Sequence, residues 1–238
     1  MNISELNDWL LSKNQEPLIV GVLNVTPDSF TDGGKFLDPN TAVNHAMDMI
    51  HNGADIIDIG GESTRPFSDP VSEEEELSRV ISIIQKIREK TNIAISIDTT
   101  KSVVAEKACD VGANIVNDIS ALSFDDSMIN VVSRYDCPII LMHMIGNPKT
   151  MQESPSYKNI ISEIINHLLD RASFALKNGV KKHNIILDPG IGFGKTIEDN
   201  FTIINNIDKF TNLGYPVLIG ASRKSFIGKT LDVDENDR

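Results

Sequence analysis

The stretch SEEEELSRVISIIQKIREKTNIAISIDTTK, residues 72–101, contains one unit of the pattern that decides the fold. Its first part, 73–90, carries apolar residues at helical spacing, with Ser72 at the N-cap position, acids in the first turn and bases in the last. An isoleucine-rich run, 93–99, follows and ends in a polar group, Asp98. The stretch therefore predicts an amphipathic helix followed by a buried strand with a carboxylate near its end.

The same alternation of strand and helix continues along the whole chain. Apolar strand-like runs lie at 18–25, 54–61, 93–99, 114–120, 138–144, 184–190 and 216–222. Helical patterns lie between them, at 39–52, 73–90, 101–111, 126–135, 157–178 and 197–212. Repeated strand–helix units predict a parallel sheet, and because no linker-like or low-complexity tract interrupts them we expect a single domain over residues 1–238.

The polar residues at the strand ends favour a barrel over an open, doubly wound sheet. Nearly every predicted strand ends in glycine or a polar side chain: Asn24, Gly60, Gly61, Asp98, Asn117, His143, Asp188 and Ser222. A barrel brings such residues together at one rim, whereas an open sheet does so only near a switch point. We therefore expect a (β/α)₈ TIM barrel. Seven strands do not close it, so either the last helix–strand–helix portion is absent from this chain or the barrel is open on one side.

Composition and charge limit the partners of the chain. With 22 basic and 34 acidic residues the formal charge is -12, which argues against nucleic acid or an anionic membrane. The longest apolar runs, such as LIVGVL, fall far short of the roughly 20 residues that span a bilayer, and the N-terminal segment lacks a basic region. We expect a cytoplasmic protein in which Cys109 and Cys137, without metal-type spacing, are free thiols.

The glycine-rich stretch ILDPGIGFGKT, residues 186–196, approaches the pattern of a phosphate-binding P-loop but does not match it. Counting back from Gly194-Lys195-Thr196 places Pro189 where the first glycine must be. Proline has a fixed φ and no backbone N–H to donate, so the nest of amides that holds a phosphate would be lost. We therefore expect this loop to have another role.

The strand ends provide a donor and acceptor set that suits an organic ring. Asp98, Asn117 and Asp188 offer two carboxylates and an amide, which match a flat heterocycle with several N–H groups better than a metal. The alternative for Asp98 is an N-cap role, for which Thr99 or Thr100 is better placed. For His143 a satisfied core histidine and a ligand-binding group are equally favoured.

Three loops at the predicted rim add further candidates. The first, 24–34, is rich in turn-forming residues and contains Phe30, so it is expected to act as a mobile lid. The second, 60–70, places Arg65 beside hydroxyl side chains, a set that suits a phosphate or carboxylate.

The third loop, GASRKSFIGK at 220–229, carries two adjacent cations. Arg223 and Lys224 cannot both point inward, and we expect Lys224 to reach the cavity. A helix is expected to begin at Ser225, with its N-terminus adding positive potential.

Seven blocks of the sequence together resemble dihydropteroate synthase. They are GVLNVTPDSFTDGG, DIGGESTRP, SIDTTK, NIVNDIS, LMHMIGNPKTMQ, ILDPGIGFGKT and GASRKSFIG, and the resemblance extends from about residue 17 to the end. It implies a (β/α)₈ barrel that joins 6-hydroxymethyl-7,8-dihydropterin pyrophosphate to p-aminobenzoate and releases pyrophosphate in folate synthesis. It also implies that sulfonamides compete with the aminobenzoate.

The resemblance further implies roles for individual residues. Asp98, Lys224 and Arg65 would be catalytic, and a Mg²⁺ ion would be held at Asn24. The p-aminobenzoate and the leaving pyrophosphate would be framed by Phe30, Thr64, Arg65, Pro66 and Ser225. The pterin would be bound by Asp98, Asn117, Asp188, Lys224, Met142, Phe193 and Gly220.

Two features depart from this family. Phe67 stands where the family usually has glycine, so sulfonamide sensitivity is expected to differ. The family's last strand carries an arginine and a His-Asp pair that this chain does not show, and its last helices form a dimer contact. We expect a homodimer for the full-length protein.

Two other functions compete with the synthase. A pterin-binding methyltransferase barrel shares the pterin carboxylates but has no reason to keep GNPKTMQ and SRKSF. A non-catalytic pterin-binding fragment is the rival of another class. Pyrophosphate release separates the synthase from both.

Overall fold

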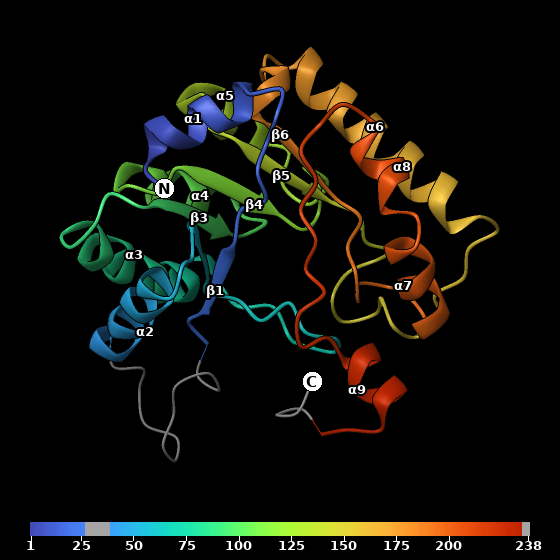
Figure 1. Ribbon diagram of the computed structural model, residues 1–238. Coiled ribbons are helices and arrows are strands. Elements are labelled where there is room, and N and C mark those ends of the chain that lie inside the picture. Colours follow the sequence, from blue (N-terminus) through green and yellow to red (C-terminus); the bar gives the residue numbers. More distant parts are fainter. Residues whose placement is uncertain (27–38, 235–238) are drawn as a thin grey trace.

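The computed structural model describes residues 1–26 and 39–234 and shows a parallel sheet surrounded by helices (Figure 1). The strands follow one another in the sheet in the order β1-β2-β3-β4-β5-β6, and every neighbouring pair is parallel. Their bounds are β1 (Val20–Asn24), β2 (Ile56–Gly60), β3 (Ala94–Asp98), β4 (Ile115–Asp118), β5 (Ile139–Met142) and β6 (Ile185–Asp188). Successive units in sheet order are the arrangement of a (β/α)₈ barrel, which confirms the predicted fold class for these strands.

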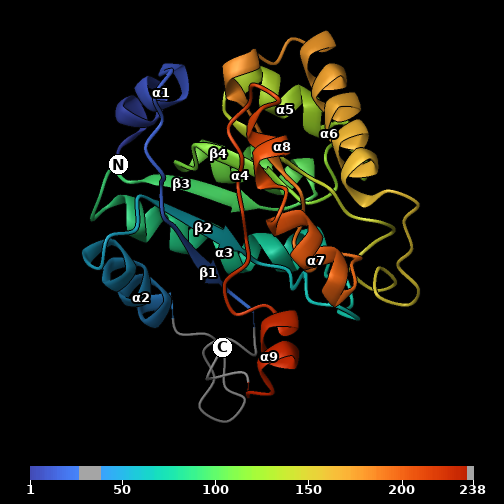
Figure 2. The same cartoon turned by 45° about the vertical axis from the view of Figure 1, so that its right-hand side comes forward.

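Helices cover the outer face of this sheet, and two more, α1 and α9, lie at its two ends (Figures 1 and 2). They are α1 (Ile3–Leu11), α2 (Pro39–His51), α3 (Glu73–Arg88), α4 (Ser102–Asp110), α5 (Met128–Tyr135), α6 (Ile160–Lys177), α7 (Ile197–Ile204), α8 (Ile207–Thr211) and α9 (Ser225–Leu231), with a 3₁₀ turn η1 (Lys182–Asn184). Among the described residues, no helix has both the length and the apolar character to cross a membrane.

The predicted seventh strand, 216–222, is reduced to a single bridge. Val217 pairs in parallel with Leu187, and the Leu218 N–H donates to the Leu187 carbonyl at 2.9 Å. Farther along, Ile219 remains 39% exposed. Within residues 1–26 and 39–234 no strand pairs with the other edge of this segment, so only its start, against β6, is held in a ladder. The prediction of a full strand was wrong.

The predicted helix at 197–212 is broken in two by a pair of asparagines. α7 ends at Ile204, and α8 begins at Ile207. Between them the Asn206 side chain donates to the Thr202 carbonyl at 2.8 Å, a bond that competes with continued helix. Single-helix continuity was therefore a wrong prediction, although both segments remain helical.

Helix α1 was not predicted from the sequence, yet it closes one end of the sheet. A capping box begins it, because the Asn2 side chain accepts from Glu5 N at 3.0 Å and Glu5 Oε2 accepts from Asn2 N at 2.8 Å. Its buried face, Leu6 and Leu10, packs against a ring of strand residues, namely Ile56, Ala94, Ile115, Ile140 and Ile186. In both views α1 lies at the opposite end of the strands from α9 (Figures 1 and 2).

The strands have one face toward the helices and one toward the interior. Ile57, Ile59, Ile95 and Ile97 belong to the large core shared with the helices. The alternating positions belong to the interior, where the apolar ring against α1 gives way to polar residues toward the carboxyl ends. The register places Asp58 beside Ser96 and Gly60 beside Asp98. The fold therefore separates an apolar floor from a polar rim.

Removing the plug that α1 provides should destabilise the whole protein. Leu6 is 0% exposed, so Leu6→Ala should lower the free energy of unfolding by about 2–5 kcal/mol in denaturant titrations. Leu11, on the same helix, is 63% exposed, so Leu11→Ala is a matched control that should change the free energy of unfolding by less than about 0.5 kcal/mol. Equal losses of stability in the two variants would contradict the proposed stabilising role of α1.

Candidate active site

A row of polar residues crosses the carboxyl ends of four neighbouring strands. Asn24, Gly60, Asp98 and Asn117 are in register on β1, β2, β3 and β4. A Cβ added to Gly60 would lie 3.4 Å from Asp98 Oδ2 and 3.5 Å from Asn24 Oδ1. The side chains of Asp98 and Asn24 therefore converge over the glycine from both sides.

Asp98 carries a buried oxygen that the protein does not satisfy. Its Oδ1 is buried and has no hydrogen-bond partner among the described residues. Burial, and then the charges of Asp58, Glu76 and Asp118, raise the pKa of Asp98 well above its usual value, while Lys224 opposes the shift. A buried acceptor without a donor is costly, which makes it a candidate for binding a ligand N–H.

The N-cap alternative for Asp98 does not hold. At the start of α4 the Lys101 N–H donates to Thr99 Oγ1 at 3.2 Å, and the Ser102 N–H donates to Asp125 Oδ2 at 2.7 Å. Thr99 and Asp125 therefore serve the helix start, and Asp98 is left facing the rim.

Asp58 belongs to the same cluster and was missed by sequence reasoning. Its Oδ2 accepts from the Asn117 side-chain amide at 3.1 Å, and burial raises the pKa of its carboxyl. This bond directs the Asn117 NH₂ group toward Asp58. The signal was available, because Asp58 stands two positions before Gly60 and so shares its inward face.

Asp188 forms the other side of the cluster, on β6. Its Oδ1 accepts from Gly190 N at 2.7 Å, and burial raises the pKa of the carboxyl to about 6. Met142, 3% exposed, is its register partner on β5. The two residues bring the strand ends of β5 and β6 to the same rim.

Lys224 is half-buried and its charge acts on Asp98 and Asp188, whereas Arg223 is exposed. The Lys224 ammonium lies 4.3 Å from the centre of the Phe193 ring. A Cβ on Gly192 would lie only 3.0 Å from Lys224 Cδ, so the glycine leaves room for the lysine stem. Burial lowers the pKa of Lys224, while the charges of Asp188 and Asp98 act in the opposite direction.

The glycine loop 189–196 packs against the protein and is not a phosphate cradle. A Cβ on Gly190, where φ is 71°, would lie 2.0 Å from the His143 carbonyl oxygen. Lys195 is 4% exposed, and its ammonium donates to the carbonyls of Phe193 at 2.8 Å and His143 at 3.2 Å. Because this lysine is buried in the protein, the exclusion of a P-loop is consistent with the structure.

His143 is part of this buried packing. Its Nδ1 lies 3.1 Å from the Lys195 ammonium, and its ring contacts His167 edge-on with centroids 5.0 Å apart. Burial, followed by the charge of Lys195, lowers the pKa of His143 to about 2, so the imidazole is neutral. These contacts favour a satisfied core histidine over a ligand-binding group.

The predicted loop residues differ in exposure. Thr64 is half-buried, Arg65 and Pro66 are exposed, and Ser225 is exposed at the start of α9. Phe30 lies outside the described residues. A Cβ on Gly220 would meet no described atom within 4 Å.

Phe67 occupies a backbone conformation that explains why glycine suits this position. Its φ is 67°, in the left-handed region, and its side chain is 65% exposed. The Phe67 N–H donates to the Pro148 carbonyl at 3.0 Å, which links the 61–72 loop to the loop after β5.

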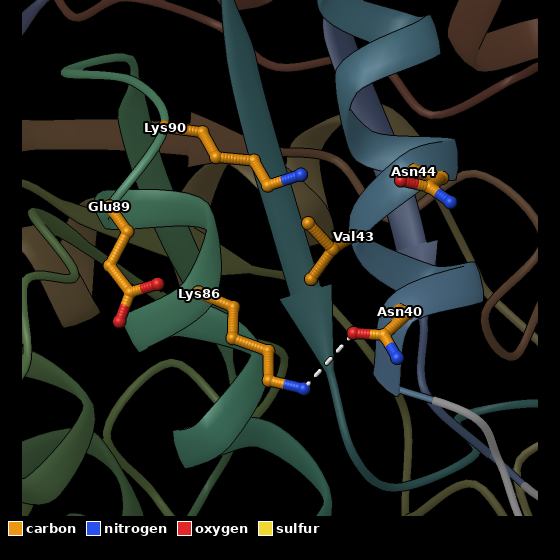
Figure 3. Close-up of a pocket in the computed structure, with 6 residues that line it drawn as sticks. All are labelled: Asn40, Val43, Asn44, Lys86, Glu89 and Lys90. Atoms are coloured by element: carbon orange, nitrogen blue, oxygen red, sulfur yellow. Dashed lines mark hydrogen bonds between the residues drawn. The ribbon is translucent and has the colours of Figure 1, made fainter.

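A hollow lies between α2 and the end of α3 in the outer helix layer (Figure 3). It is lined by Asn40, Val43, Asn44, Lys86, Glu89 and Lys90 of α2 and the end of α3, and the Lys86 ammonium donates to Asn40 Oδ1 at 3.2 Å. It shares no residue with the carboxylate cluster and is not part of the candidate site.

A metal is not the best occupant of the carboxylate cluster. Across residues 1–26 and 39–234, no three His, Cys, Asp or Glu side chains are grouped to hold an ion. Asn24 Oδ1 is an oxygen donor of the kind that Mg²⁺ accepts, but a single protein ligand fits an ion held mainly by substrate phosphates and water. The cluster itself combines buried acceptors with the ammonium of Lys224, which suits a ring bearing N–H groups and a carbonyl.

Comparison with known proteins agrees with this chemistry. A family described as pterin binding enzyme matches residues 20–238. The dihydropteroate synthase of Clostridium beijerinckii is 51% identical over 220 residues, which are 92% of this chain and 79% of the relative. The chain therefore has the fold of a pterin-binding enzyme of the barrel type.

Two solved structures align with most of the chain. A Yersinia pestis dihydropteroate synthase with a sulfonamide drug complex has a TM-score of 0.88 at 38% identity, covering 93% of this chain and 80% of that one. A Xanthomonas albilineans dihydropteroate synthase in complex with 7,8-dihydropteroate has a TM-score of 0.84 at 35% identity, covering 93% and 79%. The chain belongs to the dihydropteroate synthase family.

The buried carboxylate of Asp188 should cost stability at neutral pH. The pKa of Asp188 is about 6 in the folded protein, whereas the usual pKa of an aspartate is 3.8. The free energy of unfolding therefore falls as the pH rises from about 4 to about 6. Asp188→Asn retains an acceptor for Gly190 N and removes this cost. Its free energy of unfolding should exceed the wild-type value by about 1–3 kcal/mol at pH 7.5 and match it near pH 4.

Denaturant titrations at several pH values measure this difference. Asp8→Asn, an exposed substitution on α1, is the control and should show a difference from wild type that does not change with pH. A loss of stability in Asp188→Asn at pH 7.5 would refute the assignment of Asp188 as a destabilising group.

Proposed function

We propose that the chain condenses 6-hydroxymethyl-7,8-dihydropterin pyrophosphate with p-aminobenzoate, forming 7,8-dihydropteroate and pyrophosphate. The observation that carries the proposal is the buried Asp98 oxygen without a donor, together with the Lys224 ammonium, whose charge acts on both Asp98 and Asp188. Members of the family are transferases of folate biosynthesis, and their names and bound ligands support the same reaction.

The polar rim would recognise the pterin by its hydrogen-bonding edge. Asp98, Asn117 and Asp188 would accept from or orient the ring N–H and amino groups, and Lys224 would donate to the ring carbonyl oxygen and a ring nitrogen. Binding gives the buried carboxylates the donors that the protein itself does not provide, which favours a nitrogen-rich ring over an apolar one. Met142, Phe193 and Gly220 would line the flat faces of the ring.

Release of pyrophosphate is the main electrostatic task of the reaction. The leaving group carries several negative charges in a protein whose formal charge is -12, so local cations must stabilise it. Arg65, with the hydroxyls of Thr64 and Ser225, would provide donors at the rim, and Phe30 and Pro66 would frame the aminobenzoate. A bound Mg²⁺, held in part by Asn24, would supply further charge neutralisation.

The reaction needs no strong base in this arrangement. If the bond from the exocyclic carbon to oxygen breaks first, the electron-rich dihydropterin delocalises the positive charge. Asp98, beside a ring N–H, would favour that cation, and its raised pKa reflects how poorly its negative charge is compensated before the substrate binds. The neutral aromatic amine then attacks the carbon and loses its proton to solvent.

Other features of the chain are part of the same proposal. We infer one domain over residues 1–238, because the single sheet and its shared core extend from β1 to α9. A cytoplasmic location is supported by the free thiols of Cys109 and Cys137, which lie side by side without a disulfide. The expected homodimer stays a prediction.

Turnover distinguishes the proposed reaction from its rivals. With the dihydropterin pyrophosphate, p-aminobenzoate and Mg²⁺, the protein should release pyrophosphate in amounts that exceed the enzyme many times over. A phosphate assay after pyrophosphatase measures this release, and omission of p-aminobenzoate should abolish it. Pterin binding in calorimetry without release would indicate a binding protein instead of a synthase.

Loss of the central charges should abolish activity. Asp98→Ala and Lys224→Ala each remove a charge-assisted hydrogen bond to the ring, so kcat/KM should fall by at least about 100-fold. Lys229→Ala, an exposed lysine on α9, is the matched control for Lys224 and should retain activity within about twofold. Undiminished activity of Asp98→Ala or Lys224→Ala would refute the assigned roles.

A further inference from the structure

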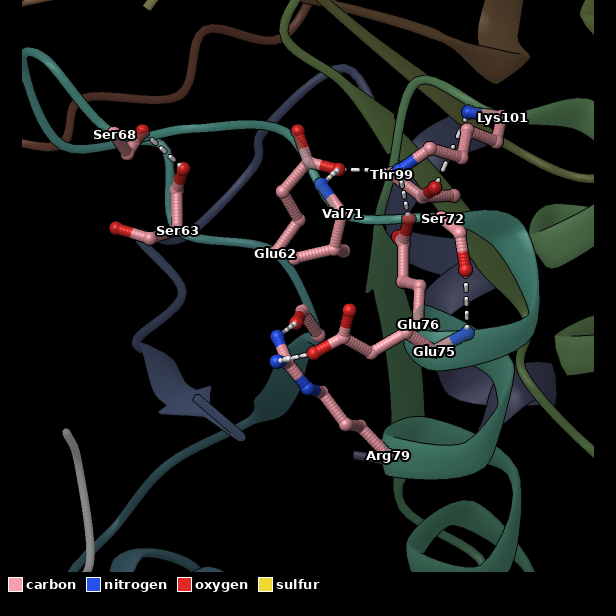
Figure 4. A network of polar contacts seen from close by, with 11 residues as sticks. Glu62, Ser63, Ser68, Val71, Ser72, Glu75, Glu76, Arg79, Thr99 and Lys101 are labelled. Atoms are coloured by element: carbon pink, nitrogen blue, oxygen red, sulfur yellow. Dashed lines mark hydrogen bonds and ion pairs between the residues drawn. The ribbon is translucent and has the colours of Figure 1, made fainter. Parts of the chain in front are cut away.

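An ionic network links the loop after β2, helix α3 and the start of α4 (Figure 4). The Lys101 ammonium binds Glu62 Oε2 and lies 2.5 Å from Glu76 Oε2. Glu62 follows β2, Glu76 belongs to α3, and Lys101 is the N-cap residue of α4. One lysine therefore ties together the segments that follow two neighbouring strands.

The network is charged and largely removed from solvent. The side chains of Glu76, Lys101 and Glu62 are 1%, 19% and 21% exposed. Burial alone would lower the pKa of Lys101, but its bonds to Glu62 and Glu76 more than compensate and raise the pKa above its usual value. The lysine therefore remains an ammonium that balances two carboxylates.

Glu62 also closes the base of the loop that carries Arg65. Its Oε2 accepts the Val71 N–H at 3.4 Å, which joins the two ends of the 62–71 segment. Next to it, the Arg79 guanidinium donates to the Gly61 carbonyl at 2.6 Å. The loop base is thus held by groups from α3 and from the start of α4.

Hydrogen bonds inside the loop connect this anchored base to the backbone of Arg65. The Ser68 hydroxyl lies 2.6 Å from the Ser63 carbonyl and 2.8 Å from the Arg65 carbonyl, so it ties the backbone of Arg65 to the residue after Glu62. The segment between the anchor and Arg65 is therefore short and internally braced. A shift at Glu62 would be transmitted to the backbone that bears the guanidinium.

Stability alone gives a weak reason for such a network. A buried ion pair recovers little more than its desolvation cost, and apolar residues of similar volume commonly stabilise a protein as well or better. A charged network does fix geometry, because its hydrogen bonds are directional. That property matters where a loop must hold a group near reacting atoms.

We propose that Glu62 and Lys101 are positioning residues that fix the base of the 62–71 loop, so that Arg65 is held where the aminobenzoate and the leaving pyrophosphate meet. The role of Arg65 in this inference rests on the proposed function. Neither Glu62 nor Lys101 contacts the substrates in it, and both act through the loop.

Substitutions at Glu62 test the inference without leaving a buried charge unpaired. Glu62→Ala removes the anchor on the loop side and leaves the buried Lys101–Glu76 pair intact, whereas Lys101→Met would leave two carboxylates without a cation and impair folding. For Glu62→Ala, kcat/KM for p-aminobenzoate should fall by about 10- to 100-fold. Glu62→Gln keeps a neutral acceptor and should give an intermediate loss.

Two measurements separate positioning from a general loss of structure. Asp69→Asn is the matched control, because it removes a carboxylate from the same loop where the Asp69–Lys149 pair is exposed, and its activity should stay within about twofold of wild type. The affinity of Glu62→Ala for a pterin without phosphates, measured by calorimetry, should equal that of wild type. A parallel loss of pterin affinity would overturn the inference.

A double-mutant cycle with Arg65 tests whether Glu62 acts through that residue. If it does, Glu62→Ala combined with Arg65→Ala should be no worse than Arg65→Ala alone, within about twofold. Multiplying losses would show that the two residues act independently and would overturn the inference.

Hydrogen exchange tests the anchor separately from catalysis. Amides of residues 62–71 should exchange faster in Glu62→Ala than in wild type and Asp69→Asn, while strands β2 and β3 keep their protection. Unchanged exchange in this loop would overturn the inference. An inactive wild-type protein would instead contradict the proposed function, and the exchange result would still decide whether Glu62 anchors the loop.

Discussion

The rest of the structure depends on burying carboxylates at strand ends with too few donors to satisfy them. Asp98 has a buried oxygen without a partner among the described residues, and Asp188 has a pKa raised to about 6 by burial. Lys224 is the neighbouring cation, and burial lowers its own pKa. Such a cluster is unfavourable until a ligand brings N–H donors, so the same feature that weakens the fold makes the site selective.

The fold tolerates this cluster because its apolar parts lie elsewhere. Isoleucines on the outer faces of the strands pack against the helices, and a separate interior ring packs against Leu6 and Leu10 of α1. The polar positions begin only beyond that ring, toward the carboxyl ends. Binding chemistry and folding stability therefore occupy different levels of the same barrel interior, as in other barrels of this type.

The sequence predicts the repeating elements and the polar rim well, because both depend on local periodicity. Strand ends at Asp98, Asn117 and Asp188 follow directly from apolar runs that stop in polar residues. What it does not predict depends on contacts between distant segments. Helix α1 packs on strands from across the sheet, although its capping box from Asn2 to Glu5 is a local signal. The seventh strand lacks a described partner on one edge, and Asp58 gains its place through a bond to Asn117, 59 residues away. Asn205 and Asn206, before α8, are a local signal for a break in the helix. The helical spacing of the apolar residues in 197–212 outweighed that signal in the prediction.

The close approach of Gly190 to the His143 carbonyl has a consequence for the spread of drug resistance. A Cβ at position 190 would lie 2.0 Å from the His143 carbonyl oxygen, so no side chain fits there without a shift of the backbone, and a substitution of Gly190 itself is strongly disfavoured. The loop around Phe67 is different, because its side chain is 65% exposed and already departs from glycine. Resistance by substitution at the contacted residue would therefore be less accessible for an inhibitor that contacts Gly190 than for one that contacts Phe67.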